Sequence, residues 1–238
     1  MENFPEYTVS IIDNPAHLTE ALELRYKVYS KTYPELIRNV SANSESDCFD
    51  PRSIHIGLYA ESASGKKLAG YCRLILPEFF SACLEDYLLR EHPLYNFPNP
   101  YTKERMAVSA RLLKTGYYEK VESLCKNFEQ DGIIYIETSR LILDENYRGL
   151  SLMMFFFKKL FTISNALNIR QTFFTCRPHH IAFYQNYGFT PFPGTCAFDN
   201  EIFGIHHLLF GNVQEIASGL ECTARKENKK AFEFKSAA

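Results

Sequence analysis

The chain has 238 residues, of which 46% are hydrophobic and 23% are charged, and its formal net charge at pH 7 is −2. This length and composition predict one large domain, or one domain with appendages, around a substantial core. The small net charge argues against a nucleic-acid binder driven by global electrostatics. No segment has the uncharged length needed to span a bilayer, so we expect no integral membrane contact.

The N-terminal segment and the cysteines bear on the cellular location of the protein. The segment MENFPEYTVS is acidic and lacks the apolar core of a secretory signal. The seven cysteines are scattered, odd in number and without a CxxC or other metal-ligand spacing. We therefore expect reduced thiols, no metal site and a cytoplasmic location.

The first 32 residues predict a strand followed by a helix. Tyr7–Ile12 alternates modestly between apolar and polar residues, as a strand does. Asn14 is suited to cap a helix, and Pro15 fits the first helical turn. The helix is expected to reach about Thr32, with these residues at helical spacing: Leu18, Leu22, Tyr26 and Tyr29.

Residues 54–61 and 67–76 predict two strands of a hairpin, with Gly65 in the turn. Arg73 lies in the second strand and by alternation shares a face with Tyr71 and Ile75. An arginine buried among apolar neighbours needs carboxylate partners.

The polar connection 34–51 supplies the nearest unassigned acids, Asp47 and Asp50. Paired aspartates in loops are usually turn formers or helix caps, and this pair has no further ligand that would suggest a metal. Arg25, in the first helix, is either a surface residue or another buried arginine held by carboxylates.

Residues 78–130 form an inserted region of mixed character. Residues 81–92 predict a short amphipathic helix, and the proline-rich and aromatic-rich segment 93–101 predicts an ordered loop or a lid. A further helix is expected over 119–130, with an apolar face made by Val121, Leu124, Cys125 and Phe128.

The segment 133–143, IIYIETSRLIL, predicts a strand that is buried on both faces. Glu137, Ser139 and Arg140 interrupt it, and a buried ionisable group needs either a partner or a function. Alternation places Glu137 and Ser139 on one face and Arg140 on the other, unless a bulge re-aims it.

A turn and a long apolar helix over 151–167 follow this strand. A helix N-terminus directly after a central strand is a ready anion site. The backbone amides of Tyr147, Arg148, Gly149 and Leu150 are the expected phosphate contacts, with added charge from Arg148, unless Arg148 is an ordinary surface residue.

The rest of the chain predicts further strands around one short helix. The sequence therefore indicates an α/β fold with a mixed sheet, in a single domain over 1–219 and a C-terminal tail over 220–238. The expected elements are a strand over 171–176, a helix from Pro178 that stops at Gly188, and strands over 189–192 and 202–210.

Two stretches resemble the GCN5-related N-acyltransferase superfamily: IETSRLILDENYRGLSLMMFFFKKL and IAFYQNYGFTP. The resemblance implies a mixed, mostly antiparallel central sheet flanked by helices. The superfamily's phosphate loop reads R-G-x-G-x-G/A, whereas Arg148-Gly149-Leu150 is followed here by Ser151, Leu152 and Met153. The later small residues of that loop are thus partly lost.

A narrower resemblance, to acyl-homoserine-lactone synthases and long-chain N-acyl amino acid synthases, covers about two-thirds of the chain. It is carried by the ordered set Arg25 in LRYKVY, Asp47 and Asp50 in DCFD, Arg73 in GYCRLIL, and ETSR at 137–140. In that family these charges cluster at the acceptor site, and the acyl donor is usually acyl carrier protein. The chain lacks the tryptophan typical of autoinducer synthases and extends further at its C-terminus, which favours N-acylation of an amino acid or related amine.

The resemblance assigns roles to individual residues. Glu137 is the candidate base, with Ser139 and Arg140 beside it, although Glu137 is equally consistent with a carboxylate tied to an arginine. Tyr184 is the candidate proton donor to the departing thiolate, or else a packing residue. The phenylalanines of the 151–167 helix are expected in the core more than in an acyl pocket, and His179 and His180 are expected to face solvent or cap a helix.

The predicted activity is transfer of a medium or long acyl chain to an amine, with no tightly bound cofactor. The donor is carried on phosphopantetheine, as acyl-ACP or acyl-CoA. The alternatives are an autoinducer synthase that uses S-adenosylmethionine, an acetyl-CoA-dependent small-molecule N-acetyltransferase, and a catalytically silent acyl- or lipid-binding protein.

Overall fold

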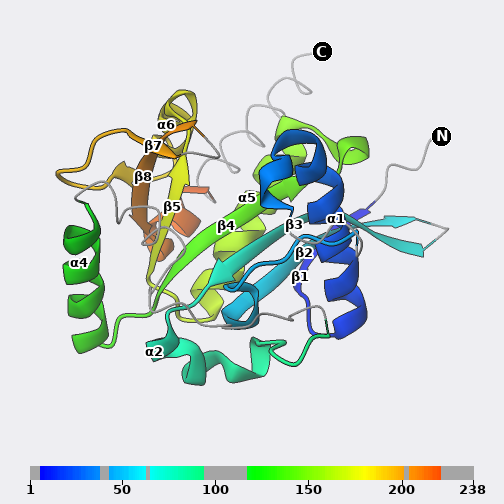
Figure 1. Ribbon diagram of the computed structural model, residues 1–238, viewed down its shortest axis with the longest axis horizontal. Coiled ribbons are helices and arrows are strands. Elements are labelled where there is room, and N and C mark those ends of the chain that lie inside the picture. Colours follow the sequence, from blue (N-terminus) through cyan, green and yellow to red (C-terminus); the bar gives the residue numbers. More distant parts are fainter. Residues whose placement is uncertain (1–5, 38–42, 63–64, 94–116, 201–203, 221–238) are drawn as a thin grey trace, which may run out of the picture.

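The computed structural model describes residues 6–37, 43–62, 65–93, 117–200 and 204–220. Within them, eight strands form a sheet in the order β1-β2-β3-β4-β5-β8-β6, and β7 pairs with β8 (Figure 1). Only β4 and β5 pair in parallel, and the other pairs are antiparallel. The prediction of a mixed, mostly antiparallel sheet flanked by helices is confirmed.

The N-terminal half forms as its local signals predict. The Asn14 side chain caps α1 by accepting a hydrogen bond of 2.9 Å from the backbone N–H of His17. Gly65 begins β3 with φ 109°, a left-handed conformation that glycine adopts readily. The elements are β1 (Glu6–Ile11), α1 (Pro15–Thr32), the 3-10 turns Pro34–Leu36 and Asp50–Arg52, β2 (Ser53–Ser62) and β3 (Gly65–Ile75).

The inserted region differs in part from the prediction. In place of one helix over 81–92, the chain forms α2 (Glu78–Ser81) and a 3-10 stretch at Ala82–Tyr87. Leu84 has φ −129° and ψ 26°, which interrupts the helix. The predicted helix 119–130 is confirmed as α4 (Tyr118–Gln130). The predicted lid at 93–101 lies, apart from Pro93, outside the described residues.

The C-terminal half adds two elements that were not predicted. One is the short strand β7 (Phe198–Asn200), and the other is a helical segment over 213–220. The remaining elements match the expected positions to within a few residues: β4 (Tyr135–Leu143), a 3-10 turn at Glu145–Tyr147, α5 (Leu150–Ala166), β5 (Gln171–Cys176), a 3-10 turn at Pro178–His180, α6 (Ile181–Gln185), β6 (Thr190–Pro191) and β8 (Gly204–Asn212).

Helices cover both faces of the sheet. On one face α1 packs through Leu18 and Leu22 against Tyr71 of β3, while α4 packs near Tyr135 of β4. On the other face, Phe156 and its neighbours in α5 belong to the largest core cluster, together with side chains of β2, β3 and β4. Within the described residues no helix has the length and apolar character needed to cross a membrane.

β4 and β5 stay together for only part of their length. Their pairing covers Tyr135–Glu137 of β4 and Gln171–Phe173 of β5, and beyond it the two strands diverge (Figure 1). The hydroxyls of Thr138 and Thr172 lie 2.9 Å apart where the pairing ends. This divergence opens the centre of the sheet between Thr138 and the C-terminal end of β5.

Candidate active site

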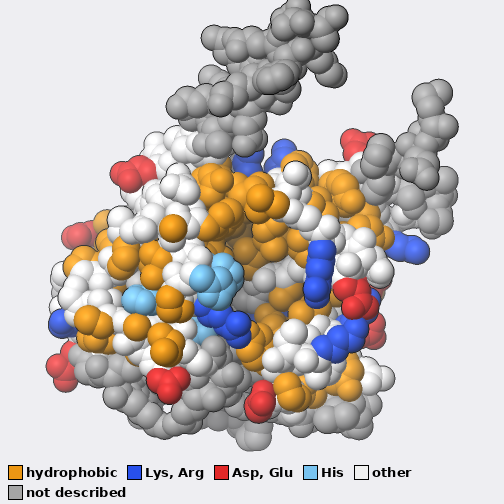
Figure 2. Space-filling view, turned by 90° about the horizontal axis from the view of Figure 1, so that it is seen from above, with side chains coloured by type: hydrophobic (Ala, Val, Ile, Leu, Met, Phe, Trp, Pro, Cys, Tyr) orange, Lys and Arg blue, Asp and Glu red, His pale blue; other side chains and the backbone are white. Residues whose placement is uncertain are grey.

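A cleft of about 330 Å³ occupies the space between the diverging strands. Seen from above, the molecule is hollowed there, with hydrophobic side chains in the hollow and histidine, lysine and arginine side chains near its rim (Figure 2). The cleft is lined by Tyr29, Tyr33, Glu137, Thr138, Ser139, Arg140, Leu141, Phe157, Phe161, Phe174, Thr175, Cys176, Arg177, His180, Tyr184 and His206.

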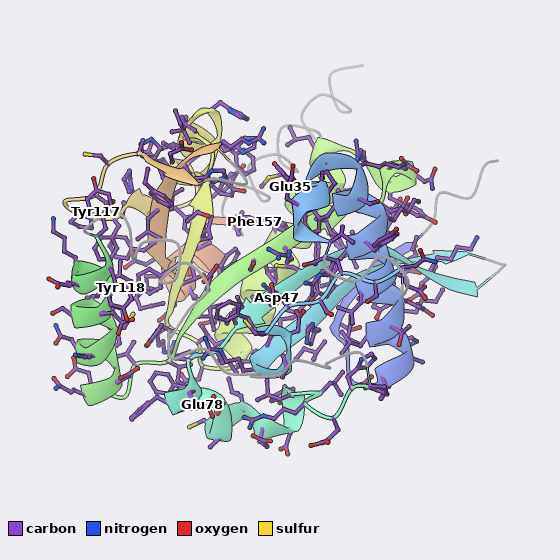
Figure 3. The ribbon with its side chains drawn as sticks, viewed as in Figure 1. Glu35, Asp47, Glu78, Tyr117, Tyr118 and Phe157 are labelled. Atoms are coloured by element: carbon purple, nitrogen blue, oxygen red, sulfur yellow. The ribbon has the colours of Figure 1, made fainter. Side chains whose placement is uncertain are left out.

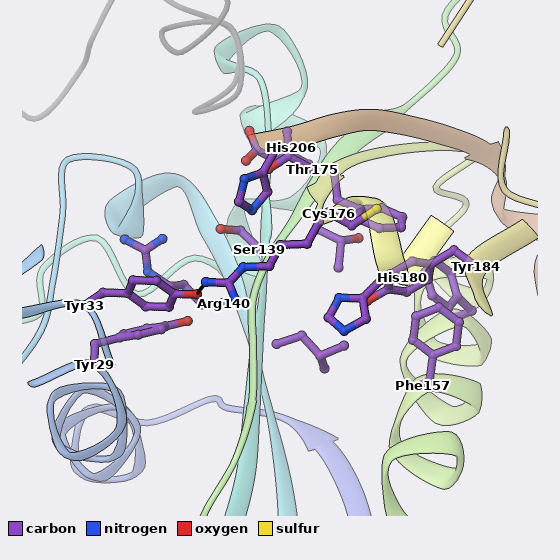
Figure 4. A pocket seen from close by; sticks show the side chains of 16 residues that line it. Tyr29, Tyr33, Ser139, Arg140, Phe157, Thr175, Cys176, His180, Tyr184 and His206 are labelled. Atoms are coloured by element: carbon purple, nitrogen blue, oxygen red, sulfur yellow. Dashed lines mark hydrogen bonds between the residues drawn. The ribbon is translucent and has the colours of Figure 1, made fainter. Parts of the chain in front are cut away.

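Four predicted site residues therefore line one cleft: Glu137, Ser139, Arg140 and Tyr184. They come from two elements, β4 and α6, that the divergence of β4 and β5 places on opposite walls. Figure 4 shows the Arg140 side chain extending toward Tyr29 and Tyr33, with His180 and Tyr184 on the other side of the pocket.

A bulge in β4 re-aims Arg140. The pairing with β3 shifts between Tyr71 and Arg73, and Arg140 adopts φ 57°, which is rare for a residue other than glycine. The Arg140 guanidinium reaches Glu45 and Asp47, each at 3.1 Å. Simple alternation would place Arg140 on the face opposite Glu137 and Ser139. The bulge instead brings it to Asp47, which also binds Arg73, and to Glu45, which also binds Arg25.

The predicted charge network is assembled as expected. Arg25 contacts Asp50 at 2.6 Å, and Arg73 contacts Asp47 at 2.6 and 2.7 Å. Asp50 also binds Arg73, so one carboxylate joins the α1 arginine to the β3 arginine. Arg25, Arg73 and Asp50 have no solvent exposure, and Asp47 lies over the central strands (Figure 3).

Glu45 is a sixth member of this network that the sequence analysis missed. It is 1% exposed and binds both Arg25 and Arg140. Although burial alone raises its pKa, the charges of Arg25 and Arg140 outweigh burial and hold the pKa at about 2. Its place two residues before Asp47, in SESD, was the available signal. With Glu45, three arginines face three carboxylates, so the network is neutral.

His55 and Tyr71 extend the network into the sheet. His55 Nδ1 lies 2.7 Å from the Tyr71 hydroxyl, which in turn lies 3.5 Å from Arg25 Nη1. Burial lowers the pKa of His55 to about 4, so the ring is neutral at pH 7. A neutral ring suits this place because Arg25 and Arg73 already supply positive charge.

The structure places Glu137 in the cleft and near the buried Arg52. It is 2% exposed and lines the cleft, yet its negative charge also raises the pKa of the buried Arg52. Burial is the larger effect on Arg52, and the net result is a lowered pKa of that guanidinium. Glu137 is therefore a cleft carboxylate with an arginine in its surroundings.

The opposite wall is aromatic. The Tyr184 ring lies 4.6 Å from Phe174 and 5.9 Å from Phe157, and Phe157 stacks edge-on to Phe161 at 4.8 Å. Phe157 and Phe161 are buried, as predicted for core residues, and they also line the cleft. Burial raises the pKa of Tyr184 to about 12, so its hydroxyl keeps its proton at pH 7.

The predicted phosphate contacts lie outside this cleft, at the start of α5. Tyr147 ends a 3-10 turn, and Gly149 is the N-cap of α5, whose first turn has no side-chain cap and no acidic residue. Leu150 is 71% exposed and begins the helix. The Tyr147 N–H is not available to an anion, because it donates a hydrogen bond of 2.9 Å to the carbonyl oxygen of Asp144. The amides at the start of α5 itself have no carboxylate competitor, which suits an anion.

Sequence reasoning missed several cleft residues. Tyr33 is the C-cap of α1, Arg177 follows β5, and His180 ends the next 3-10 turn. His180 was predicted to face solvent or cap a helix; it is exposed, but it also lines the cleft. His206 of β8 lines it too, and only strand pairing across the sheet brings it there. Within the described residues, no cluster of acids, histidines and cysteines is arranged to hold a metal ion.

Comparison with solved structures shows which proteins have a similar fold. No family model and no curated protein matches the sequence. The structure matches the CoA-dependent acyl-homoserine lactone synthase MesI with a TM-score of 0.54 and 18% identity, over 92% of this chain and 94% of MesI. It matches BjaI, another such synthase solved with SAM and isopentyl-CoA, with a TM-score of 0.58 and 13% identity, over 92% and 89%.

FeeM, an N-acyl amino acid synthase from uncultured soil microbes, matches with a TM-score of 0.52 and 12% identity, over 90% of this chain and 94% of FeeM. At these identities the likeness shows the fold. The expected GNAT-like acyltransferase fold is confirmed, and substrates follow from none of these matches.

Proposed function

We propose that this protein is an N-acyltransferase that moves a medium or long acyl chain from a phosphopantetheine thioester to the amine of an amino acid or related small molecule. The observation that carries the proposal is the cleft between β4 and β5, which is lined both by the polar residues Glu137, Ser139 and Arg140 and by aromatic residues that include Tyr184. The likeness in fold to acyl-homoserine lactone and N-acyl amino acid synthases supports the same reaction class.

The reaction forms a C–N bond and breaks the C–S bond of the thioester. Glu137, directly or through a water, takes the proton that the amine loses as it attacks the carbonyl carbon. Tyr184 donates its hydroxyl proton to the departing thiolate, for which its raised pKa keeps the proton available at neutral pH. The aromatic wall of Phe157, Phe161 and Phe174 is suited to an acyl chain.

The donor is held at two places in this proposal. The amides of Arg148, Gly149 and Leu150 at the start of α5 bind the phosphate of acyl-ACP or acyl-CoA, and the Arg148 side chain adds positive charge. The pantetheine arm then enters the cleft beside the unpaired part of β4. Phe157 lies seven residues beyond Leu150, about two helical turns, so the arm has a short distance to cover.

Glu137→Gln tests the assignment of the base. We expect kcat for amide formation to fall by about 10²- to 10⁴-fold, since the isosteric amide cannot accept the proton. Purified protein is assayed with acyl-CoA or acyl-ACP and amino acids, and product is followed by mass spectrometry. Glu122→Gln is the matched control, because Glu122 is 7% exposed on α4 and does not line the cleft. Unchanged product formation by the variant removes Glu137 from the role of base.

Lipid extracts of an expressing host test the reaction class. N-acyl amino acids that appear only with the active gene support the proposal. Acyl-homoserine lactones instead indicate an autoinducer synthase that uses S-adenosylmethionine. If neither product appears, purified protein is tested with acetyl-CoA and small amines, and turnover identifies an N-acetyltransferase. If acetyl-CoA is not turned over either, the remaining alternative is a catalytically silent acyl-binding protein.

A further inference from the structure

The charged residues of the cleft differ in how they are neutralised. Arg140 is bound by Glu45 and Asp47, and the charge of Glu137 acts on the buried Arg52. Arg177 is the third charged side chain of the cleft wall. In the part of the chain that the structure describes, no carboxylate lies within salt-bridge distance of Arg177.

Arg177 is nonetheless held in one orientation. Its Nη2 donates a hydrogen bond of 2.6 Å to the Tyr33 hydroxyl, and its guanidinium lies 5.8 Å from the centre of that ring. Arg177 follows β5 and Tyr33 ends α1, so the pair joins opposite sides of the cleft. A tyrosine hydroxyl leaves the guanidinium charge intact and occupies one of its five N–H donors.

The surroundings of Arg177 favour an anion. Tyr33 lies beside Tyr29, with ring centres 6.1 Å apart, and Arg140 lies over Tyr29 at 5.3 Å, so two arginines border the same tyrosine pair (Figure 4). Burial, followed by the charges of His179 and Arg177, lowers the pKa of His180. An anion placed between Arg140 and Arg177 meets two guanidiniums, and within the described residues that of Arg177 is bound by no carboxylate.

We infer that Arg177, oriented by Tyr33, binds the carboxylate of the acceptor, so that the acceptors of this enzyme are amino acids and not simple amines. This inference rests on the proposed function and names its substrate class. A guanidinium presents parallel N–H groups that match a carboxylate. With its carboxylate at Arg177, an α-amino acid directs its amine toward the polar wall of β4, where Glu137 and Ser139 lie. Arg177 is the specificity residue, and Tyr33 is a positioning residue that fixes its guanidinium.

Binding of product tests the inference without turnover. The probes are N-dodecanoylglycine, which carries the carboxylate, and N-dodecanoylglycinamide, which lacks its charge, titrated into the full-length protein by calorimetry. We expect the wild type to bind the acid at least tenfold more tightly than the amide, and Arg177→Met to lose that preference while retaining amide affinity. Arg177→Lys should restore part of the preference for the acid, because lysine keeps the positive charge but lacks the paired N–H donors of a guanidinium.

Arg170→Met is the matched control. Arg170 immediately precedes β5 and Arg177 immediately follows it, so the two arginines flank one strand roughly 20 Å apart. Arg170 does not line the cleft. This variant should keep the preference for the acid, which separates loss of the carboxylate contact from general loss of positive charge or damage to β5.

Kinetic assays with two groups of acceptors distinguish failure of this inference from failure of the proposed function. Glycine and leucine are compared with methylamine and isopentylamine as acceptors, and Arg177→Met should reduce kcat/KM about tenfold or more for the amino acids alone. Acyl transfer with equal preference for both groups, or an acid preference that survives in Arg177→Met, overturns the inference and leaves the enzyme an acyltransferase. Absence of acyl transfer to any amine counts against the proposed function, while the calorimetry still decides the carboxylate site.

Discussion

Tyr184 packs against other aromatic rings and, in the proposed mechanism, also donates a proton. Its ring does the packing, and its hydroxyl group donates the proton. Its ring contacts Phe174, Phe157 and Phe189, and a phenylalanine would keep those contacts. For Tyr184→Phe we therefore expect a melting temperature close to that of the wild type, while kcat falls by about 10²-fold through loss of the proton donor. Phe183→Leu on the same helix is the control for altered packing. Equal kcat for Tyr184→Phe and the wild type would leave Tyr184 with packing alone.

Individual residues were predictable where several signals agreed. Arg25 and Arg73 stood out because an arginine among apolar neighbours needs partners, while Asp47 and Asp50 were selected as the nearest unassigned acids and by the family resemblance; the structure joins all four. Glu45 was not predicted because it lies just outside the DCFD segment that carries the resemblance, and an acid in a polar connection needs no explanation of its own. Arg177 and His206 were missed for a related reason: nothing near them in sequence indicates that they border a cleft.

At the scale of elements, the start of α5 offers a separable test of donor binding. A Cβ added at Gly149 would meet nothing within 4 Å, and its backbone is extended, so alanine fits there. For Gly149→Ala we expect the free energy of unfolding to change by less than about 0.5 kcal/mol. We expect affinity for CoA to fall several-fold, since the new methyl group covers amides that bind phosphate in the proposal. Both are measured on one preparation, by urea unfolding and by calorimetry.

Gly70→Ala is the contrasting variant. A Cβ there would lie 2.7 Å from Leu143 and 2.9 Å from the carbonyl oxygen of Ile142, between β3 and β4. We expect Gly70→Ala to lower the free energy of unfolding by about 1–3 kcal/mol, because the backbone of β4 cannot move away from the new methyl group. Unchanged CoA affinity in Gly149→Ala would remove this turn from donor binding.

Elements with strong local signals were predicted well. The cap at Asn14, the alternation of the hairpin and the apolar run of β4 each gave the right element. The helix predicted over 81–92 is wrong, since Leu84 leaves helical geometry within it and the 3-10 stretch ends at Tyr87. The strand predicted over 189–192 shortens to Thr190–Pro191, although the N–H of Phe192 still donates to the carbonyl oxygen of Leu208 in β8.

For the whole molecule, the buried charge network predicts loss of stability in acid. It ties α1, the 43–52 segment, β3 and β4 together through Glu45, Asp47 and Asp50. The arginines lower the pKa of Glu45 from 4.5 to about 2 and lower that of Asp47 further. A folded-state pKa below the unfolded value stabilises the protein above the unfolded pKa, and that stability is lost as pH falls. The free energy of unfolding should therefore decline between about pH 4.5 and pH 2.

Glu45→Gln tests the source of this decline. Urea unfolding followed by circular dichroism from pH 7 to pH 2.5 should show a variant that is less stable at pH 7 by about 3–5 kcal/mol, because two arginines lose a buried partner. Its stability should also fall less steeply with acid than that of the wild type. Glu61→Gln is the control, because Glu61 binds Thr8 at the sheet edge. The free energy of unfolding of this variant should depend on pH as that of the wild type does. Parallel curves for Glu45→Gln would locate the acid sensitivity elsewhere.

The sequence by itself determined the class of fold, most of the elements and the charged residues that need one another, because capping, periodicity and the cost of an unpaired buried charge all act locally or on residue type. Tertiary structure alone decided where β4 leaves β5, that a bulge turns Arg140 toward Glu45 and Asp47, and that Tyr33 and Arg177 meet across a cleft. These contacts depend on strand register and on the angle between elements, which arise from packing of the whole sheet against its helices.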